Sequence, residues 1–125
     1  MRPHHFKDFQ GDLKKTHKYC VALAKDNHFT TYSAILTVFD WKEAFVIQIR
    51  KLSFLLDEIS ILEHKKGNGL LSSVIIREDK GRPGVGFFKM AKRLTLYSGI
   101  IIDGNITEMS GFHQEQLDLV HSKFQ

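Results

Sequence analysis

Apolar residues recur at helical spacing through the first third of the chain. Residues 5–25 place their apolar side chains on one face while lysines fall largely elsewhere on the wheel, which predicts an amphipathic helix. The segment DNHF at 26–29 interrupts this pattern. Thr30 or Thr31 then provides an N-cap for a short second helix that extends through Val38.

A longer apolar stripe predicts a third helix over residues 41–62. Asp40 followed by Glu43 resembles a capping box at its start, and the segment HKKGNG supplies lysines and glycine at its end. Additional apolar residues such as Val46 and Ile61 widen the stripe beyond a single row. We therefore expect this helix to be central to the core or to a contact between two copies of the chain.

The period of the pattern changes in the second half. LLSSVII at 70–76 is short, rich in branched residues and bounded by turn residues, which predicts a strand covered on both faces. REDKGRPGVGFF at 77–88 predicts a long exposed turn, because glycine permits unusual backbone angles and proline cannot donate to a sheet. The residues expected to shape the turn are Gly81, Pro83, Gly84 and Gly86. The chain then returns as a strand, VGFF, with Phe87 and Phe88 in the core.

The last third mixes two periods. FKMAKRLTLY at 88–97 has helical spacing, with its cations on one side. GIIIDGNIT predicts a strand and a tight hairpin around Asp103, Gly104 and Asn105. Ser110 provides a cap for a final helix.

Two or three helices, a strand, a glycine-proline turn and a return strand follow one another in the order of a winged helix. We therefore expect an α+β fold, a helix-rich single domain over residues 1–125 with a winged-helix-like core and a small β-hairpin or sheet. Residues 1–29 would form the N-terminal helix and 30–98 the winged-helix-like core. Residues 99–125 would form a C-terminal hairpin and helix.

Length and composition agree with one soluble globular domain. The chain has 125 residues, of which 42% are hydrophobic and 26% charged. No apolar run approaches the roughly 20 residues that cross a bilayer, and the first 25 residues alternate charged with apolar groups, unlike a signal peptide. The single cysteine, Cys20, cannot form an internal disulfide. We expect a cytoplasmic protein without a membrane partner.

Positive charge gathers around the turn. Residues 77–93 hold six basic and two acidic residues, and this excess of four equals the net charge of the whole chain, +4. Such a cluster attracts phosphates. The leading hypothesis is a nucleic-acid-binding module, a phage or bacterial regulator that contacts DNA or RNA through a basic wing. The expected phosphate contacts are Arg77, Lys80, Arg82, Lys89, Lys92 and Arg93, and the expected groove contacts on the long helix are Gln48, Arg50 and Lys51.

Three segments also carry a resemblance. TTYSAI, LLSSVIIREDKGRPGVGFF and MAKRL, together spanning roughly residues 30–124, resemble a group of small, mostly uncharacterised bacterial and phage proteins with a TY helix, an apolar strand and a G-x-PG-x-GFF turn. The distinctive positions are Tyr32, Gly81, Pro83, Gly84, Gly86, Phe87 and Phe88. The pattern is also similar to the winged-helix DNA-binding domain of alkyltransferases and alkyltransferase-like proteins. This chain lacks their PCHR motif, so the resemblance implies shape and gives Cys20 no alkyl-acceptor role.

Two other functions remain open. In the first, the apolar helix over residues 41–62 contacts a protein partner or a second copy, as in a dimeric adaptor or an inhibitor in phage-host conflict, and the basic turn steers the encounter. In the second, a minor alternative, Glu78, Asp79 and Lys80 after a strand resemble the acid-x-lysine pair of metal-dependent nucleases. Those carboxylates lie on a turn, whereas such ligands need to be fixed at the end of a central strand.

The sequence predicts no catalytic residue, metal ligand or cofactor. Its seven histidines are scattered without paired ligand spacing, and no nucleophile with a nearby base can be selected. The glycines of GRPGVG precede aromatic residues and lack the strand-to-helix context of a dinucleotide fingerprint. A binding protein is therefore favoured over an enzyme.

Overall fold

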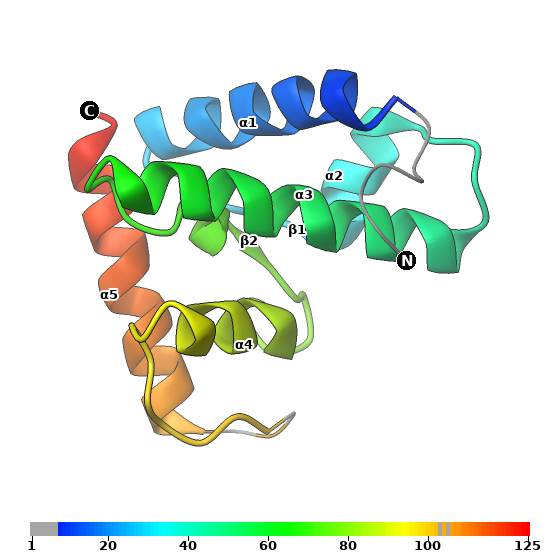
Figure 1. Cartoon of the computed structure of the whole chain (residues 1–125). Helices are drawn as coiled ribbons and strands as arrows, with labels where there is room; N and C mark the ends of the chain where they lie inside the picture. Colours follow the sequence, from blue (N-terminus) through cyan, green and yellow to red (C-terminus); the bar gives the residue numbers. More distant parts are fainter. Residues whose placement is uncertain (1–7, 103, 105) are drawn as a thin grey trace.

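Helices dominate the described part of the chain, with one short pair of strands between them (Figure 1). The computed structural model describes residues 8–102, 104 and 106–125. In chain order the elements are α1 (Phe9–Lys25), β1 (Thr30–Thr31), α2 (Tyr32–Phe39), α3 (Phe45–Lys65), the 3-10 turn η2 (Leu71–Val74), β2 (Ile75–Ile76), α4 (Val85–Arg93) and α5 (Thr107–Lys123). The expected α+β class, rich in helix with a small sheet, is confirmed.

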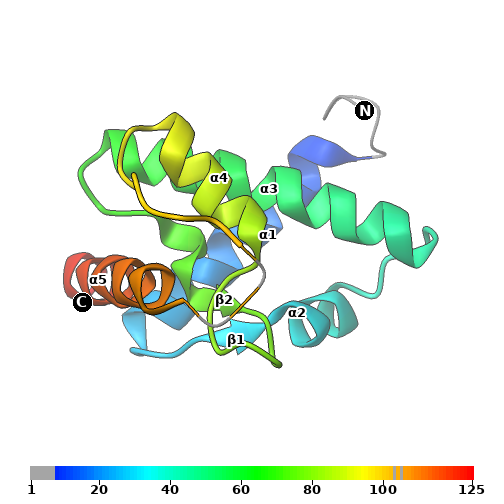
Figure 2. The same cartoon turned by 90° about the horizontal axis from the view of Figure 1, so that it is seen from below.

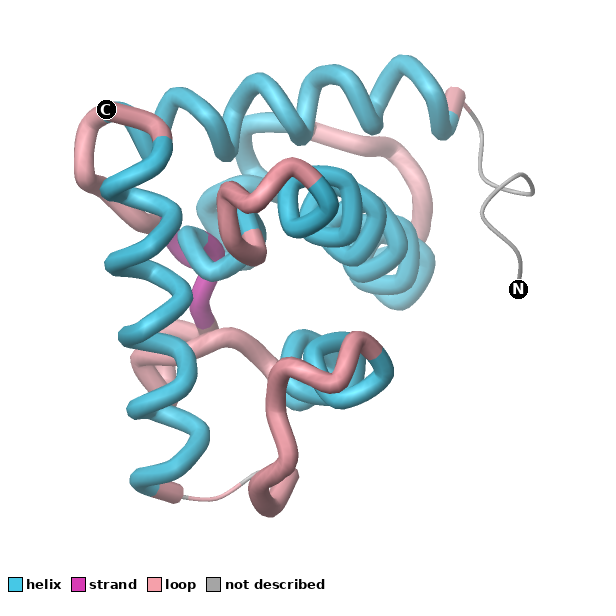
Figure 3. Tube along the Cα trace, turned by 60° about the vertical axis from the view of Figure 1, so that its left-hand side comes forward, coloured by secondary structure: helices cyan, strands magenta, loops and turns pink. Residues whose placement is uncertain are grey.

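The elements enclose η2, which contacts α1, α3 and α5. α1 packs against α3 and crosses it at a wide angle, α4 contacts another side of α3, and α5 runs across one end of this group (Figure 3). Figure 2 shows the strand pair lying between α2 and α5. The main core cluster draws buried residues from segments far apart in the sequence, including Cys20, Leu52, Val74 and Leu117.

A second core cluster is aromatic and joins α4 to α5. Phe88 is fully buried, with its ring centroid 5.6 Å from that of Tyr97 and 6.2 Å from that of Phe112. Phe87 packs edge-on against Phe88 at 5.1 Å. The prediction that both phenylalanines enter the core is confirmed, and these ring contacts position α4.

The predicted return strand is wrong, because the residues after the turn begin α4. Phe87, Phe88, Met90 and Ala91 are all buried, and their spacing suits one face of a helix rather than alternate faces of a strand. β2 pairs in parallel with β1, Thr30 opposite Ile75. The winged-helix core is therefore not confirmed, since in the described residues the turn does not join two paired strands.

The boundaries of α2 and α3 differ from the prediction at one point. Thr31 caps α2 as expected, its Oγ1 accepting from the Ala34 N–H at 3.2 Å. Asp40, expected to start the long helix, instead ends α2 in the left-handed conformation, with φ 50°. The Gln48 side chain donates to the carbonyls of Trp41 and Glu43, at 3.0 and 2.7 Å. These bonds hold the link between the helices in a non-helical path, so α3 begins at Phe45.

The hairpin predicted over residues 99–107 lies partly outside the described residues. Asp103 and Asn105 lie outside the described residues, and residues 99–102 form no strand. The final helix is present as α5 and begins at Thr107, before the expected Ser110 cap. Among the helices of the described residues, none has an apolar stretch long enough to cross a bilayer.

Candidate binding groove

The glycine-proline turn is a closed loop. The Arg77 N–H donates to the Arg82 carbonyl at 2.8 Å, and the Gly81 N–H donates to the Arg77 carbonyl at 2.9 Å. Gly81 has φ 68°, in the left-handed region that glycine enters without steric cost. Gly81, one of the residues expected to shape the turn, lies where the chain reverses, and the loop has a defined conformation rather than an open protrusion.

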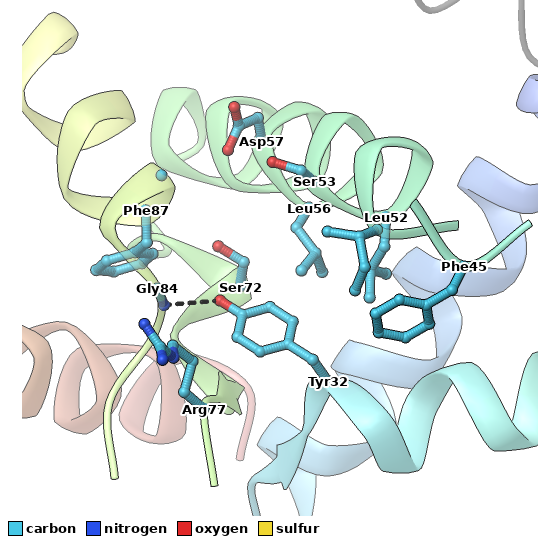
Figure 4. Close-up of a pocket in the computed structure, with 12 residues that line it drawn as sticks. Tyr32, Phe45, Leu52, Ser53, Leu56, Asp57, Ser72, Arg77, Gly84 and Phe87 are labelled. Carbon is cyan, nitrogen blue, oxygen red and sulfur yellow. Dashed lines mark hydrogen bonds between the residues drawn. The ribbon is translucent and has the colours of Figure 1, made fainter. Parts of the chain in front are cut away.

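The end of the turn is anchored to α2. The Gly84 N–H donates to the Tyr32 hydroxyl at 3.0 Å, a contact between residues far apart in the sequence (Figure 4). Pro83 is buried beside it, and Gly86 lies in the first turn of α4. The bond between Gly84 and Tyr32 therefore holds the start of α4 near the start of α2, opposite one face of α3.

These elements enclose a cavity of about 520 Å³, which we call the α3 groove. Its floor is one face of α3, and its other walls come from α2, η2, the turn and the start of α4 (Figure 4). The lining residues are Tyr32, Phe45, Ile49, Leu52, Ser53, Leu56, Asp57, Ser72, Arg77, Gly84, Gly86 and Phe87. A cavity of this size with mainly apolar walls and a few polar groups is typical of binding sites.

One end of the groove is apolar and open to solvent. Leu52 and Leu56 are buried along its floor, while Phe45 is 69% exposed and Ile49 39% exposed at its rim. Val46, next to Phe45 on the first turn of α3, is also exposed. The first two turns of α3 thus present large apolar side chains to water, which is unusual unless another molecule covers them.

The other end of the groove is polar. Asp57 is partly buried there, and this burial raises its pKa to about 6, although the guanidinium of Arg93 acts in the opposite direction. The Arg93 Nη2 lies 3.5 Å from the Asp57 Oδ2. Burial also raises the pKa of Tyr32, whose hydroxyl faces the same cavity. Asp57 and the Tyr32 hydroxyl are groups that can hydrogen-bond a polar atom of a bound molecule.

Two of the predicted nucleic-acid contacts are buried. Lys51 is 2% exposed, forms an ion pair with Asp12, and places its ammonium 4.5 Å from the centroid of the Trp41 ring. Arg82 is 4% exposed and donates to the Gly104 carbonyl. The prediction that Lys51 and Arg82 contact nucleic acid is wrong for this structure, because neither cation reaches the surface.

Two further predicted contacts are engaged within the protein. The Arg77 guanidinium donates to both carboxylate oxygens of Asp79, at 3.1 and 2.8 Å, and this bond lowers the pKa of Asp79. The side-chain amide of Gln48 donates to the carbonyls of Trp41 and Glu43 in the link before α3. The charge of Arg77 is therefore largely offset by its neighbour.

The remaining predicted cations reach the surface. Arg50, Lys89, Lys92 and Arg93 are exposed and Lys80 is half-exposed. Lys89, Lys92 and Arg93 all lie on α4 and are exposed, whereas Lys51 and Arg82 are buried.

The metal-ligating and nucleophilic side chains in the described part of the chain do not form a reaction centre. No set of three or more His, Cys, Asp or Glu side chains there is placed to hold a metal ion. Cys20 is fully buried, and this burial raises the pKa of its thiol. His113 is buried against the Ser73 carbonyl at 2.8 Å, which marks it as a structural residue.

No protein-family model, curated protein or solved structure matches this chain. The resemblance to small bacterial and phage proteins and to alkyltransferase-like domains therefore stays a prediction. Sequence analysis did not identify Asp57 as a groove residue, since a carboxylate on a helix otherwise suggests a solvated face. A weak signal was present, because Asp57 follows Ile49, Leu52 and Leu56 on the same helical stripe.

Proposed function

We propose that this protein is a protein-interaction module that binds an apolar segment of a partner in the α3 groove. The observation that carries this proposal is the continuity between exposed Phe45 and Ile49 at the rim and buried Leu52 and Leu56 on the floor. Protein interfaces typically bury a few apolar anchors in such a pocket, and these anchors supply most of the binding free energy.

The exposed apolar surface favours a protein over a small molecule as the occupant. Val46 is exposed and lies outside the cavity lining, so the apolar surface continues beyond the volume that an enclosed ligand would fill. A partner that covers both the groove and this adjoining turn would remove more apolar area from water. This agrees with the sequence-based alternative of a partner that binds the 41–62 helix.

The test is selection of peptides from a random display library on the immobilised protein. We expect enriched peptides that bind the wild-type chain and lose at least about tenfold in affinity on Ile49→Asp or Phe45→Asp, the loss expected for a central anchor site. Because both side chains are substantially exposed, circular dichroism and urea unfolding should change little.

Val38→Asp is the matched control, since Val38 is 60% exposed on α2 and does not line the groove. The selected peptides should bind this variant as tightly as the wild-type protein. An absence of enriched peptides, or peptides that bind the Ile49→Asp variant unchanged, would contradict the proposed function.

A second candidate, nucleic-acid binding, is favoured by the exposed cations of α4. Lys89, Lys92 and Arg93 lie within nine residues of one helix, and α4 itself carries no acidic residue. If these residues contact phosphates, retention of duplex DNA or RNA should fall steeply between about 50 and 200 mM salt, and Lys89→Glu with Lys92→Glu should flatten that dependence. Negligible retention at the lower salt concentration would exclude this candidate.

A further inference from the structure

We infer that the partner segment bound by the α3 groove is an acidic amphipathic α-helix of about three turns. This inference rests on the proposed function and specifies the chemistry of its partner. It follows from the length of the groove, the kind of backbone that fits an apolar cavity, and the cations along one edge.

The length of the groove follows from its floor. The lining residues of α3 run from Phe45 to Asp57, which at 1.5 Å per residue corresponds to about 18 Å. A helix of about 12 residues has the same length. Such a helix presents apolar side chains at positions i, i+4 and i+7 on one face, the arrangement that helix-in-groove complexes use.

The walls of the groove favour a helix over an extended strand. An extended peptide would bring unpaired backbone N–H and C=O groups against apolar walls unless a sheet edge paired with them. The described strands are two residues long, β1 pairs with β2, and Ile75 and Ile76 are buried. A helix satisfies its own backbone hydrogen bonds, so it can bury an apolar face there at lower cost.

Cations lie along the α4 side of the groove. Gly86 lines the groove, and Lys89 and Arg93 follow it by three and seven positions, which places them on the same face of α4. Arg50 lines a smaller hollow with Ser53 and Asp57, both of which also line the groove.

Carboxylates near this edge only partly offset these cations. Asp57 is paired with Arg93, and Glu58 is exposed at the next position of α3. Within the described residues, Arg50 and Lys89 form no ion pair. Carboxylates on a bound helix would supply partners for these two cations.

A second copy of the chain fits this surface less well. The same patch from another copy would bring a second set of Arg50, Lys89 and Arg93 into one interface, and the chain already carries a net charge of +4. Like charges facing each other across an interface oppose association. An acidic helix covers the same apolar residues while pairing the cations.

The test uses a display library of random peptides of about 16 residues, long enough for three helical turns. Peptides enriched on the wild-type protein at near-physiological salt should carry more Asp and Glu than the unselected library, with apolar residues at helical spacing. Circular dichroism of the free peptides with added protein should show a gain of helix. Peptide affinity should fall about tenfold on the double variant Arg50→Glu and Lys89→Glu, the effect expected for two reversed edge charges.

The matched control is Lys14→Glu with Lys15→Glu, which reverses two exposed charges on α1 away from the groove lining. Peptides that require Ile49 but show no excess of acid, or no loss on the edge variant, would overturn the acidic helix and leave the proposed function standing. Peptides that do not require Ile49 would overturn both. A dimer seen by sedimentation velocity and abolished by Ile49→Asp would assign the groove to a second copy instead.

Discussion

Asp57 is a carboxylate that lies in mainly apolar surroundings. It lines an apolar groove, and burial raises its pKa to about 6, so the ionised form is disfavoured in the folded state. A group that lowers stability at neutral pH and faces a cavity is a candidate for a role in binding. Arg93 offsets part of the cost by lying 3.5 Å away.

The Asp57 shift predicts a pH dependence of stability. Because its pKa is raised on folding, the folded state binds more protons than the unfolded state between about pH 4 and 6, and the free energy of unfolding falls as pH rises through that window. Asp57→Asn should therefore raise this free energy by about 1–2 kcal/mol at pH 7 and change it little at pH 4. Urea unfolding at several pH values measures both.

The neighbouring substitution Glu58→Gln is the control for the Asp57 prediction, since Glu58 is exposed on the same helix. It should leave the pH profile close to that of the wild-type protein. If the difference between Asp57→Asn and the wild-type protein is the same at pH 4 and pH 7, burial does not raise the pKa as described.

At the scale of elements, a buried ion pair joins α1 to α3. Lys51 of α3 pairs with Asp12 of α1, and Glu43 of the preceding link lies 3.8 Å from the same ammonium. Lys51 is 2% exposed and Asp12 6% exposed. Removing one partner of a buried pair leaves the other charge uncompensated, which typically costs several kcal/mol.

The substitution Lys51→Met should therefore lower the free energy of unfolding by about 3 kcal/mol, because it keeps the volume and leaves Asp12 buried without its cation. Arg50→Met, one position away and exposed, should change it by less than about 0.5 kcal/mol. Chemical denaturation of the three proteins compares the two effects. Equal stability of both variants would show that the pair does not hold α1 against α3.

Elements also differ in how far their own residues determine them. The stripe within α3 predicted its extent to within a few residues at each end, and Thr31 marked the start of α2. α4 was misassigned at its start, because VGFF reads locally as a strand as well as a helix. The packing of Phe88 against Tyr97 and Phe112 favours the helix, and those two residues come later in the chain.

At the scale of the whole molecule, the fold redistributes the charge that the sequence places in one segment. Of the six cations between residues 77 and 93, Arg82 is buried, Arg77 is paired with Asp79 and Lys80 is half-exposed, while Lys89, Lys92 and Arg93 reach the surface on α4. Meanwhile α2, α3, η2 and α4 together enclose a groove that no single segment forms. The surface thus favours an apolar, partly cationic binding site over a basic wing.

The sequence by itself determined the helical periods of α1, α2 and α3, the cap at Thr31 and the presence of a turn around Gly81. These features depend on residues within a few positions of one another, so local patterns encode them. Only the tertiary structure decided which cations are available and where the groove lies. Lys51 pairs with Asp12, Gly84 bonds to Tyr32, and the groove is lined by residues of several elements. These residues are far apart in the sequence, so the spacing of neighbouring residues cannot predict their contacts.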